Sequence, residues 1–263
     1  MKVMLDGQGS DEIFGGYNTA VSAQLTSLLL RGRITEAIRL AGTFGIVIPN
    51  YRGRLVLSAL GRMVPMWALN FAMSVAGEGL MPSWMDRDWF DTRGVVRRAR
   101  VQGRGHDALR EELTCSLETI SLPQLLRYED RNSMAFSIES RVPFCIPELA
   151  EFALSLPSSY LIRGPASTKA VFREAMRGVV PDAIRLRPKV GFTTPEKNWL
   201  TALRPWIIET LAAPFEAELG YLRREDLIRL VHRELGTRGF FSSTLWRAIS
   251  VVHWSRLYGV TSD

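Results

Sequence analysis

Apolar residues recur at helical spacing along most of the chain, and this periodicity predicts a mostly helical protein. A short apolar run at residues 2–5, KVML, predicts a strand at the N-terminus. Residues 45–50, GIVIPN, predict a second extended piece that Pro49 ends. The predicted helices lie at 18–30, 34–42, 54–60, 107–120, 122–136, 147–156, 168–177, 225–235 and 243–258.

The N-terminal strand raises the question of where its sheet lies. A lone strand leaves its backbone N–H and C=O groups unpaired and is not stable by itself. Because strands are scarce in the remaining sequence, we expect the partners of this strand to come from outside the chain.

Glycine and proline residues divide the chain into three parts. Residues 1–76 carry the strand, a glycine loop and the first helices, and residues 106–263 form a second helical part. Between them, residues 77–105 contain five glycines and a proline, which predicts a linker.

The composition excludes several classes of protein. With 263 residues, 46% hydrophobic and 23% charged, the chain is long and apolar enough to form a globular core, which excludes disordered and fibrous proteins. The longest uncharged stretch, residues 63–77, is shorter than a bilayer span, and no leader pattern opens the sequence. We therefore expect no membrane contact and a cytoplasmic location. The two cysteines and three histidines show no metal-ligand spacing.

The formal charge of +6 raises the possibility of nucleic-acid binding. Basic residues cluster only in residues 95–106, where no aromatic residues are interleaved for base stacking, so a solvated loop is the better interpretation. We expect no nucleic-acid partner. Only four of the 33 basic residues are lysines, which makes each of them a candidate for a specific role: Lys2, Lys169, Lys189 and Lys197.

The loop after the first strand, DGQGSDEIFGGY, suggests an anion-binding site. A strand, a glycine loop and a helix N-terminus together commonly bind phosphate, yet Asp11 and Glu12 stand where the phosphate would lie. One interpretation is that both acids complement the helix dipole, with Ser10 as the N-cap. It leaves Gly15 and Gly16 unexplained, since glycines there suggest close approach of a backbone or a ligand.

The other interpretation of this loop is a Mg²⁺-phosphate site. A divalent cation would relieve the repulsion between the carboxylates and a phosphate, because Mg²⁺ is held by one or two carboxylates together with substrate phosphates. The sequence of the loop alone leaves both interpretations open.

Two further stretches contain candidate site residues. Residues 163–178 predict a helix with Lys169 in its first turn, where the lysine is either solvated or binds an anion together with the helix N-terminus. Glu139 and Arg141 lie two apart in extended backbone, which predicts either a surface ion pair or a pair that binds the amine and carboxylate of a substrate.

Four segments together carry a family resemblance, and they span residues 5–259. In LDGQGSDEIFGGY, RYEDRNSMAFSIESRVPF, TKAVFREAMRGVVPDAIRLRPKVGF and LWRAISVVHWSRLYG, the chain resembles the synthetase domain of glutamine-hydrolysing asparagine synthetases. The resemblance is weakest between about residues 20 and 120. It implies the later part of an α/β parallel-sheet ATP pyrophosphatase domain, of the adenine nucleotide α-hydrolase type. There ATP adenylates the side-chain carboxylate of aspartate, and glutamine-derived ammonia displaces AMP.

The resemblance also implies roles for individual residues. It places Asp11 at a Mg²⁺ and pyrophosphate site, and Lys169 where a lysine stabilises charge on the phosphate. Glu139 and Arg141 fall near the substrate pocket. The pyrophosphate loop would then consist of Gly7, Gly9, Asp11 and Glu12.

Two features of that family are missing from this sequence. The chain contains no Ser-Gly-Gly-x-Asp-Ser loop, and Lys2 stands where the glutaminase domain has its cysteine. We therefore expect a fragment, a truncated gene product or one subunit of a split enzyme, inactive without a missing N-terminal segment or separate subunit.

Departures within the matching segments leave the substrate open. Gln8 stands where many asparagine synthetases have glutamate, and Ile146 replaces the acid of the family's VPFLD. The same scaffold could close a peptide macrolactam or a β-lactam, and a non-catalytic remnant or partner subunit is the third possibility.

Overall fold

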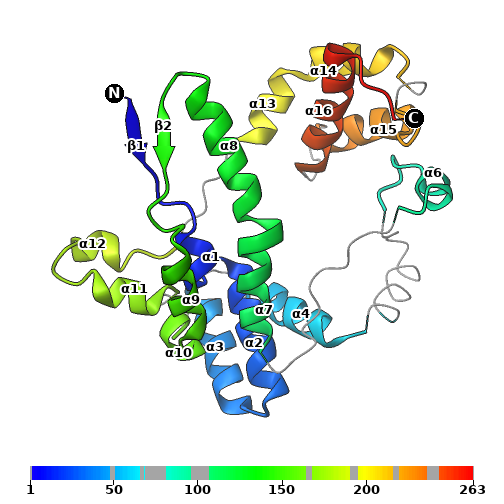
Figure 1. The fold of residues 1–263 in the computed structure, drawn as a ribbon. Helices are drawn as coiled ribbons and strands as arrows, with labels where there is room; N and C mark the ends of the chain where they lie inside the picture. Colours follow the sequence, from blue (N-terminus) through cyan, green and yellow to red (C-terminus); the bar gives the residue numbers. More distant parts are fainter. Residues whose placement is uncertain are drawn as a thin grey trace. The chain divides into compact units, whose positions relative to one another are not determined.

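The structure, a computed structural model, describes residues 2–47, 51–65, 68, 81–95, 107–163, 168–189, 195–215, 219–235 and 243–262. Within them the chain is rich in helix and contains a small parallel sheet, which confirms the mostly helical prediction (Figure 1). The chain forms two compact units, the first from Met1–Leu69 and Ala99–Val190 and the second from Asn70–Arg98 and Gly191–Asp263.

The first unit is built around a central helix, α2 (Asn18–Leu30), whose residues 20–28 are all buried. A helix that is buried on every side must be covered by neighbours all round. Helices α3, α4 and α7 provide this cover. The described elements of the unit, besides its strands, are α1 (Ser10–Phe14), α3 (Ile34–Val47), α4 (Tyr51–Met63), α7 (Ala108–Cys115), the π-helical turn η1 (Ser116–Ile120), α8 (Leu122–Met134), α9 (Pro147–Ser155), α10 (Ser158–Leu161), α11 (Ala170–Ala175) and α12 (Asp182–Arg185).

Buried polar side chains of α2 form hydrogen bonds to the backbone of the neighbouring helices α4 and α7. Thr26 is fully buried, and its hydroxyl donates to the carbonyl of Ala59 in α4 at 3.2 Å. The hydroxyl of Ser27 accepts a hydrogen bond from the backbone N–H of Leu109 in α7 at 3.1 Å. Because buried polar groups must be hydrogen-bonded, these two side chains set the positions of α4 and α7 along α2.

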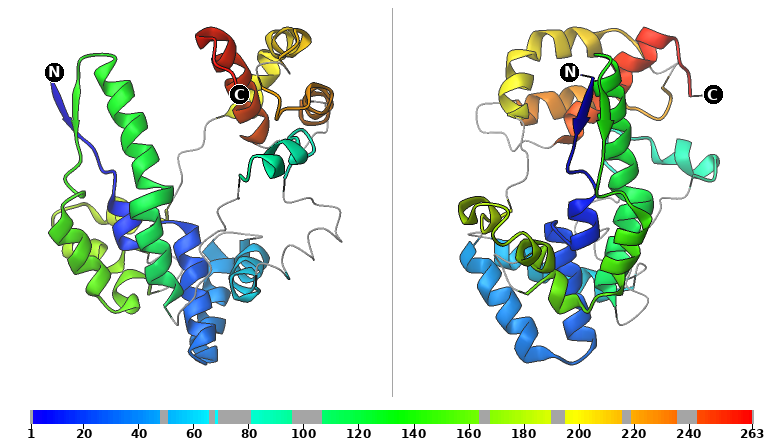
Figure 2. Two further views of the ribbon diagram at one scale, coloured as in Figure 1. Left: turned by 45° about the vertical axis from the view of Figure 1, so that its right-hand side comes forward. Right: turned by 60° about the vertical axis from the view of Figure 1, so that its left-hand side comes forward.

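The sheet corrects one expectation from the sequence. Strand β1 (Val3–Leu5) pairs in parallel with β2 (Glu139–Arg141), so the expectation that β1 has no parallel partner within the chain is wrong. Figure 2 shows the two strands side by side from two directions. The chain leaves α8 through Ser137, which adopts the left-handed conformation with φ 56°, and this turn brings β2 alongside β1. A tight turn of this kind gives no periodic signal in the sequence.

Both strands are nevertheless poorly covered. Leu5 is 73% exposed and Met4 47% exposed, although parallel strands are normally buried on both faces. The described part of the chain therefore forms only a small, open piece of parallel sheet.

Most of the predicted helices are confirmed, with shifts at their ends. Residues 45–47 belong to α3 rather than to an extended piece, and residues 48–50 lie outside the described part of the chain. The helix predicted at 168–177 is shorter, since α11 covers only Ala170–Ala175.

The second unit contains α6 (Arg87–Thr92), α13 (Glu196–Ala202), α14 (Arg204–Ala212), α15 (Arg224–Glu234) and α16 (Ser243–Tyr258). Its core consists of buried leucine and isoleucine side chains with Phe215. Residues 81–95, which were expected to belong to a linker, are part of this unit. The carboxylate of Asp86 caps α6 by accepting from the N–H of Trp89, and Trp89 packs on Tyr221 at 5.1 Å between ring centroids. The rest of the expected linker, residues 77–80 and 96–105, lies outside the described part of the chain.

None of the described helices combines the length and apolar character that a membrane crossing requires.

A buried ion pair joins α4 to α7. Arg62 Nη2 lies 2.8 Å from Glu112 Oε2, and the two side chains are only 5% and 11% exposed. Removing one charge leaves the other buried without compensation, so we expect Glu112→Gln to lower the free energy of unfolding in urea by about 3 kcal/mol. The exposed pair of Arg33 and Glu36 provides the control, because Glu36→Gln should cost less than about 1 kcal/mol.

The double variant Arg62→Met/Glu112→Leu should recover most of the loss, since apolar residues of similar size often replace a buried ion pair at little cost. Equal losses of unfolding free energy in Glu112→Gln and Glu36→Gln would show that the buried ion pair contributes no more to stability than the exposed one.

Candidate functional site

The glycine loop ends at Gly9, which is the residue before α1. Gly9 adopts a left-handed conformation with φ 93°, and a β-carbon there would lie 2.9 Å from Cys145 Sγ. Gly9 therefore lets the loop backbone rest directly on the chain at Phe144 and Cys145. Ser10 does not cap the helix, contrary to the sequence interpretation. Its hydroxyl instead accepts a hydrogen bond from Lys169 Nζ at 3.0 Å.

Asp11, in the first turn of α1, lies between two lysines. Lys169 Nζ is 2.8 Å from Asp11 Oδ1, and Lys189 Nζ is 2.8 Å from Asp11 Oδ2. The side chains of Asp11 and Lys169 are 19% and 17% exposed. Burial by itself would raise the pKa of Asp11, but the hydrogen bonds and charges of Lys169 and Lys189 outweigh it and hold that pKa below the ordinary value. Asp11 is therefore a carboxylate with both oxygens paired to ammonium groups.

The backbone of Lys169 is unusual. The residue immediately precedes α11, rather than lying in its first turn as the sequence predicted, and it adopts the left-handed conformation with φ 57°. A positive φ is uncommon for a residue with a β-carbon and is found most often where the surroundings over-determine the backbone, as at functional sites. Thr168, directly before it, is fixed by an isolated β-bridge to Ile162.

Aromatic packing brings α11 to α1, although they are about 160 residues apart in the chain. The ring of Phe14 stacks on that of Phe172 with centroids 5.3 Å apart, and Phe144 meets Phe172 edge-on at 5.2 Å. Phe14 is 4% exposed. The stack therefore fixes the distance between Asp11 on one helix and Lys169 at the start of the other.

Gly16 leaves the space in which Asp11 and Lys169 meet. A β-carbon on Gly16 would lie 1.8 Å from Asp11 Oδ1 and 2.6 Å from Lys169 Cε. The preceding residue, Gly15, ends α1 in the left-handed conformation with φ 70°. The expected close approach is therefore present at Gly16, where side chains of the chain itself approach rather than a backbone or a ligand. At Gly15 the nearest atoms lie 3.5 Å from the β-carbon position, and glycine there suits the left-handed backbone instead.

Glu12 has a different environment from its neighbour Asp11. It is 1% exposed, and its Oε1 accepts hydrogen bonds from Tyr17 Oη and from Ser121 Oγ, both at 2.7 Å. Burial, and then the carboxylate of Glu12, raise the pKa of Tyr17, so Tyr17 stays protonated and can donate. The structure therefore places the Glu12 carboxylate inside the first unit, where it joins α1 to the start of α8.

Lys189 and Arg173 are site residues that the sequence reasoning assigned no role. The Arg173 guanidinium donates to the carbonyls of Thr168 at 2.8 Å and Arg187 at 2.9 Å. One side chain thus holds the residues next to both lysines, since Thr168 precedes Lys169 and Arg187 lies two before Lys189. The scarcity of lysine in the sequence was the available signal for Lys189. Arg173 had no such signal.

The remaining candidate residues lie away from this cluster. Glu139 and Arg141 form an exposed ion pair on β2 with a distance of 2.8 Å, and within the described residues no hydrogen bond or ion pair links them to Asp11 or its lysines. A β-carbon on Gly7 would meet no atom within 4 Å, so Gly7 is not required by close packing.

The cluster fits an anion better than a metal ion. Among the described residues no group of three His, Cys, Asp or Glu side chains could hold a metal, and Asp11 already faces two ammonium groups. Two ammonium groups beside a serine hydroxyl suit the oxygens of a phosphate or of a developing oxyanion.

Comparison with known proteins adds a family match. Residues 1–256 match the family model described as asparagine synthase. The chain is 28% identical over 273 residues to a Mycobacterium tuberculosis protein named provisionally as a glutamine-hydrolyzing asparagine synthetase, covering 98% of this chain and 40% of that protein. It is 22% identical to glutamine-hydrolyzing asparagine synthetase 1 of Bacillus subtilis, covering 96% of this chain and 40% of the relative. It is also 26% identical to the amidase chry2 of Gibberella zeae, covering 76% of this chain and 33% of that protein.

The chain therefore spans about 40% of the length of the curated synthetase relatives that it matches. No solved structure matches it significantly.

The role of Gly16 can be tested by adding one methyl group. Gly16→Ala should push Asp11 away from Lys169, because the new β-carbon would overlap Asp11 Oδ1. We expect the pKa of Asp11, followed by carboxyl ¹³C NMR, to rise toward its ordinary value of about 3.9. Gly7→Ala, in the loop on the other side of α1, is the control, since a β-carbon there meets no atom within 4 Å. An unchanged pKa in the Gly16 variant would contradict the tight contact.

The lowered pKa of Asp11 predicts a pH-dependent stability. A carboxyl group with a folded-state pKa below its unfolded value stabilises the protein above the unfolded pKa, and this contribution is lost as the pH falls through the folded pKa. We expect Asp11→Asn to lower the free energy of unfolding by about 1–3 kcal/mol at neutral pH. The difference from wild type should vanish as the pH falls below the ordinary carboxyl range. A difference that is independent of pH from neutral to acid would exclude the charge as its cause.

Proposed function

We propose, because the chain belongs to the asparagine synthase family, that it is part of an ATP-dependent amide ligase of the asparagine synthetase type. The observation that carries the proposal is the pairing of Asp11 with Lys169 and Lys189 beside the glycine loop. Two partly buried ammonium groups on rigid backbone are what a site needs to stabilise charge on a phosphate.

In the proposed reaction, ATP adenylates the side-chain carboxylate of aspartate and pyrophosphate leaves. Ammonia derived from glutamine then displaces AMP and leaves the amide. Lys169 and Lys189 would bind phosphate oxygens, for which they must release the carboxylate of Asp11. Exchange of one anionic partner for another keeps both charges paired, so it avoids the cost of an isolated buried ammonium.

The remaining parts of the site are proposed to come from elsewhere. The open edge and exposed faces of β1 and β2, together with the 40% span of the synthetase relatives, support a partial domain of the adenine nucleotide α-hydrolase type. A missing N-terminal segment or a separate subunit would add the other strands and the Ser-Gly-Gly-x-Asp-Ser loop. Any Mg²⁺ would be held by Asp11 together with the nucleotide phosphates.

A second candidate substrate has specific support. The similarity to a relative named as an amidase, together with Ile146 where the family has an acid, favours amide formation on a carboxylate other than that of aspartate. Glu139 and Arg141 remain predicted substrate-pocket residues in both versions of the reaction. Product analysis separates the two versions.

The test uses a chimera in which residues 1–256 replace the matching segment of the Bacillus subtilis relative. We expect the 263-residue chain alone to release no pyrophosphate from ATP, Mg²⁺, aspartate and ammonia, and the chimera to release it and form asparagine. Pyrophosphate release only with another carboxylate would favour the second substrate. A folded chimera that is inactive with every carboxylate, or turnover by the pure chain alone, would contradict the proposed function as stated.

Lys169→Ala in the chimera should reduce kcat roughly 10²-fold, as expected for the loss of a group that stabilises charge in the transition state. Lys169→Arg should restore only part of the rate, because a planar guanidinium cannot occupy the position of the ammonium. Lys197→Ala is the control, since Lys197 is an exposed lysine in α13 of the second unit. Near-normal turnover of Lys169→Ala would show that Lys169 does not stabilise the transition state.

A further inference from the structure

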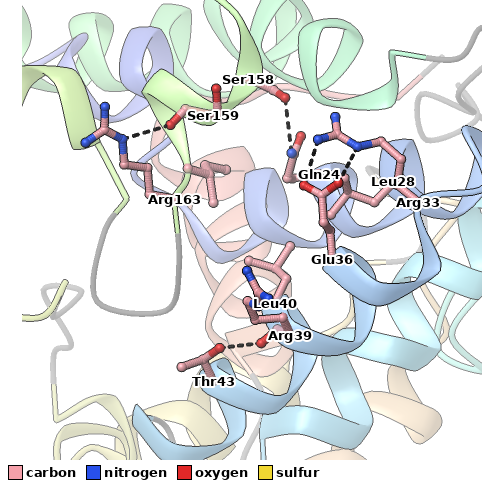
Figure 3. Close-up of a pocket in the computed structure, with 11 residues that line it drawn as sticks. Gln24, Leu28, Arg33, Glu36, Arg39, Leu40, Thr43, Ser158, Ser159 and Arg163 are labelled. Carbon is pink, nitrogen blue, oxygen red and sulfur yellow. Dashed lines mark hydrogen bonds and ion pairs between the residues drawn. The ribbon is translucent and has the colours of Figure 1, made fainter.

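A pocket with both apolar and charged lining residues lies in the first unit, and Asp11 and its lysines are not among those residues. Its volume is about 350 Å³, and residues of α2, α3 and α10 and the residues next to them line it (Figure 3). None of the candidate ligase residues is among the lining side chains. Three of the lining side chains are buried and apolar, namely Leu28, Leu40 and Ile162.

The pocket contains an unpaired polar atom. Gln24 is only 5% exposed, and its Nε2 donates to Ser158 Oγ at 3.1 Å, while its Oε1 is buried with no hydrogen-bond partner in the described part of the chain. Turning the amide over would exchange the two atoms and still leave one of them unpaired. Because buried polar groups are nearly always hydrogen-bonded, this atom indicates a partner outside the described part of the chain.

The pocket also carries excess positive charge. Arg33 is neutralised by Glu36, to which it donates two hydrogen bonds of 2.6 and 2.7 Å. Arg163 donates only to the carbonyl of Ser159, at 3.3 Å, and the guanidinium of Arg39 has no hydrogen bond or ion pair within the described residues. Figure 3 shows Arg163 and Arg33 on opposite sides of the lining residues. The Arg163 guanidinium also lies over the ring of Tyr160, 5.6 Å from its centroid. Neither Arg39 nor Arg163 is paired with a carboxylate among the described residues, so both can pair with an anion.

We propose that this pocket binds a small organic anion, a carboxylate or a phosphate monoester, that also carries a hydroxyl or amino group. Arg39 and Arg163 pair with its charge, since guanidinium groups match the geometry of carboxylate and phosphate oxygens. Its hydroxyl or amino group donates to Gln24 Oε1, for which the buried amide of Gln24 turns toward the pocket. Its carbon atoms lie against the apolar part of the lining, and a pocket of this volume holds a ligand of metabolite size.

The pocket is separate from the Asp11 cluster but shares one element with it. Ile162 lines the pocket, and its backbone pairs with Thr168, the residue before Lys169. The proposal does not depend on the ligase function, because it rests on the lining residues alone.

Isothermal titration calorimetry of the chain with L-malate, glycerol 3-phosphate and inorganic phosphate tests the proposal. We expect saturable binding of malate or glycerol 3-phosphate, and the preferred probe identifies the class of anion. Inorganic phosphate should bind at least 10-fold more weakly, because it lacks a carbon skeleton to place on the apolar lining. Arg39→Gln should weaken the organic anion at least 10-fold, and this exposed residue can be changed without disturbing the core.

Two variants serve as controls for the site. Arg54→Gln, at an exposed position of α4, and Lys169→Ala, in the Asp11 cluster, should leave the affinity unchanged. Gln24→Leu should weaken binding as Arg39→Gln does. Absence of binding by both organic probes at millimolar concentration would overturn the proposal, as would inorganic phosphate binding as tightly as they do. An equal loss of affinity in the Lys169 variant would place the anion at the Asp11 cluster and overturn it as well.

Discussion

The candidate site depends on the two ion pairs that the carboxylate of Asp11 forms with Lys169 and Lys189. Three charged groups that are partly withdrawn from water are stable only if their geometry is maintained, because each unpaired charge would pay its desolvation cost. The surrounding structure supplies that geometry. Gly16 gives the side chains room, the stacked rings of Phe14 and Phe172 set the spacing of the two helices, and Arg173 holds the backbone beside each lysine.

The core of the first unit holds α1, the helix that carries Asp11, in place. Helix α1 is short, and a helix of five residues has little stability by itself. It is held because Ile13 and Phe14 are buried in the core and because Glu12 accepts hydrogen bonds from Tyr17 and Ser121. The two neighbouring acids therefore have different roles. Glu12 holds α1 in place through hydrogen bonds, and Asp11 forms ion pairs with the two lysines.

The small parallel sheet positions the glycine loop of the site, and its exposed strands leave room for further strands. β1 leads directly into the glycine loop, and its pairing with β2 fixes the start of that loop through the hydrogen bond from the N–H of Asp6 to the carbonyl of Arg141 at 2.8 Å. Further parallel strands would cover the exposed side chains of β1 and would extend the site at the ends of the strands, where open α/β sheets bind their ligands. The proposed N-terminal segment or subunit would thus complete both the fold and the chemistry.

Local patterns in the sequence determined most of the helices and the family. The apolar periodicity predicted helices such as α2 and α16 closely, because burial of one side or all sides of a helix leaves a repeating signal in a single segment. Gly16 is another local signal, since only a missing β-carbon permits the close approach found there. The scarcity of lysine pointed to Lys169 and left Lys189 as a candidate without a role.

Only the tertiary structure decided which of these residues meet. The pairing of β1 with β2, and the hydrogen bond that Glu12 accepts from Ser121, join segments that lie far apart in the chain, and no local pattern encodes such contacts. Asp11 and Glu12 are neighbours with the same chemistry, yet one faces the lysines and the other faces the core, because successive positions on a helix point about 100° apart. The sequence therefore indicated the candidate site residues, whereas the tertiary packing determined which residue each of them contacts.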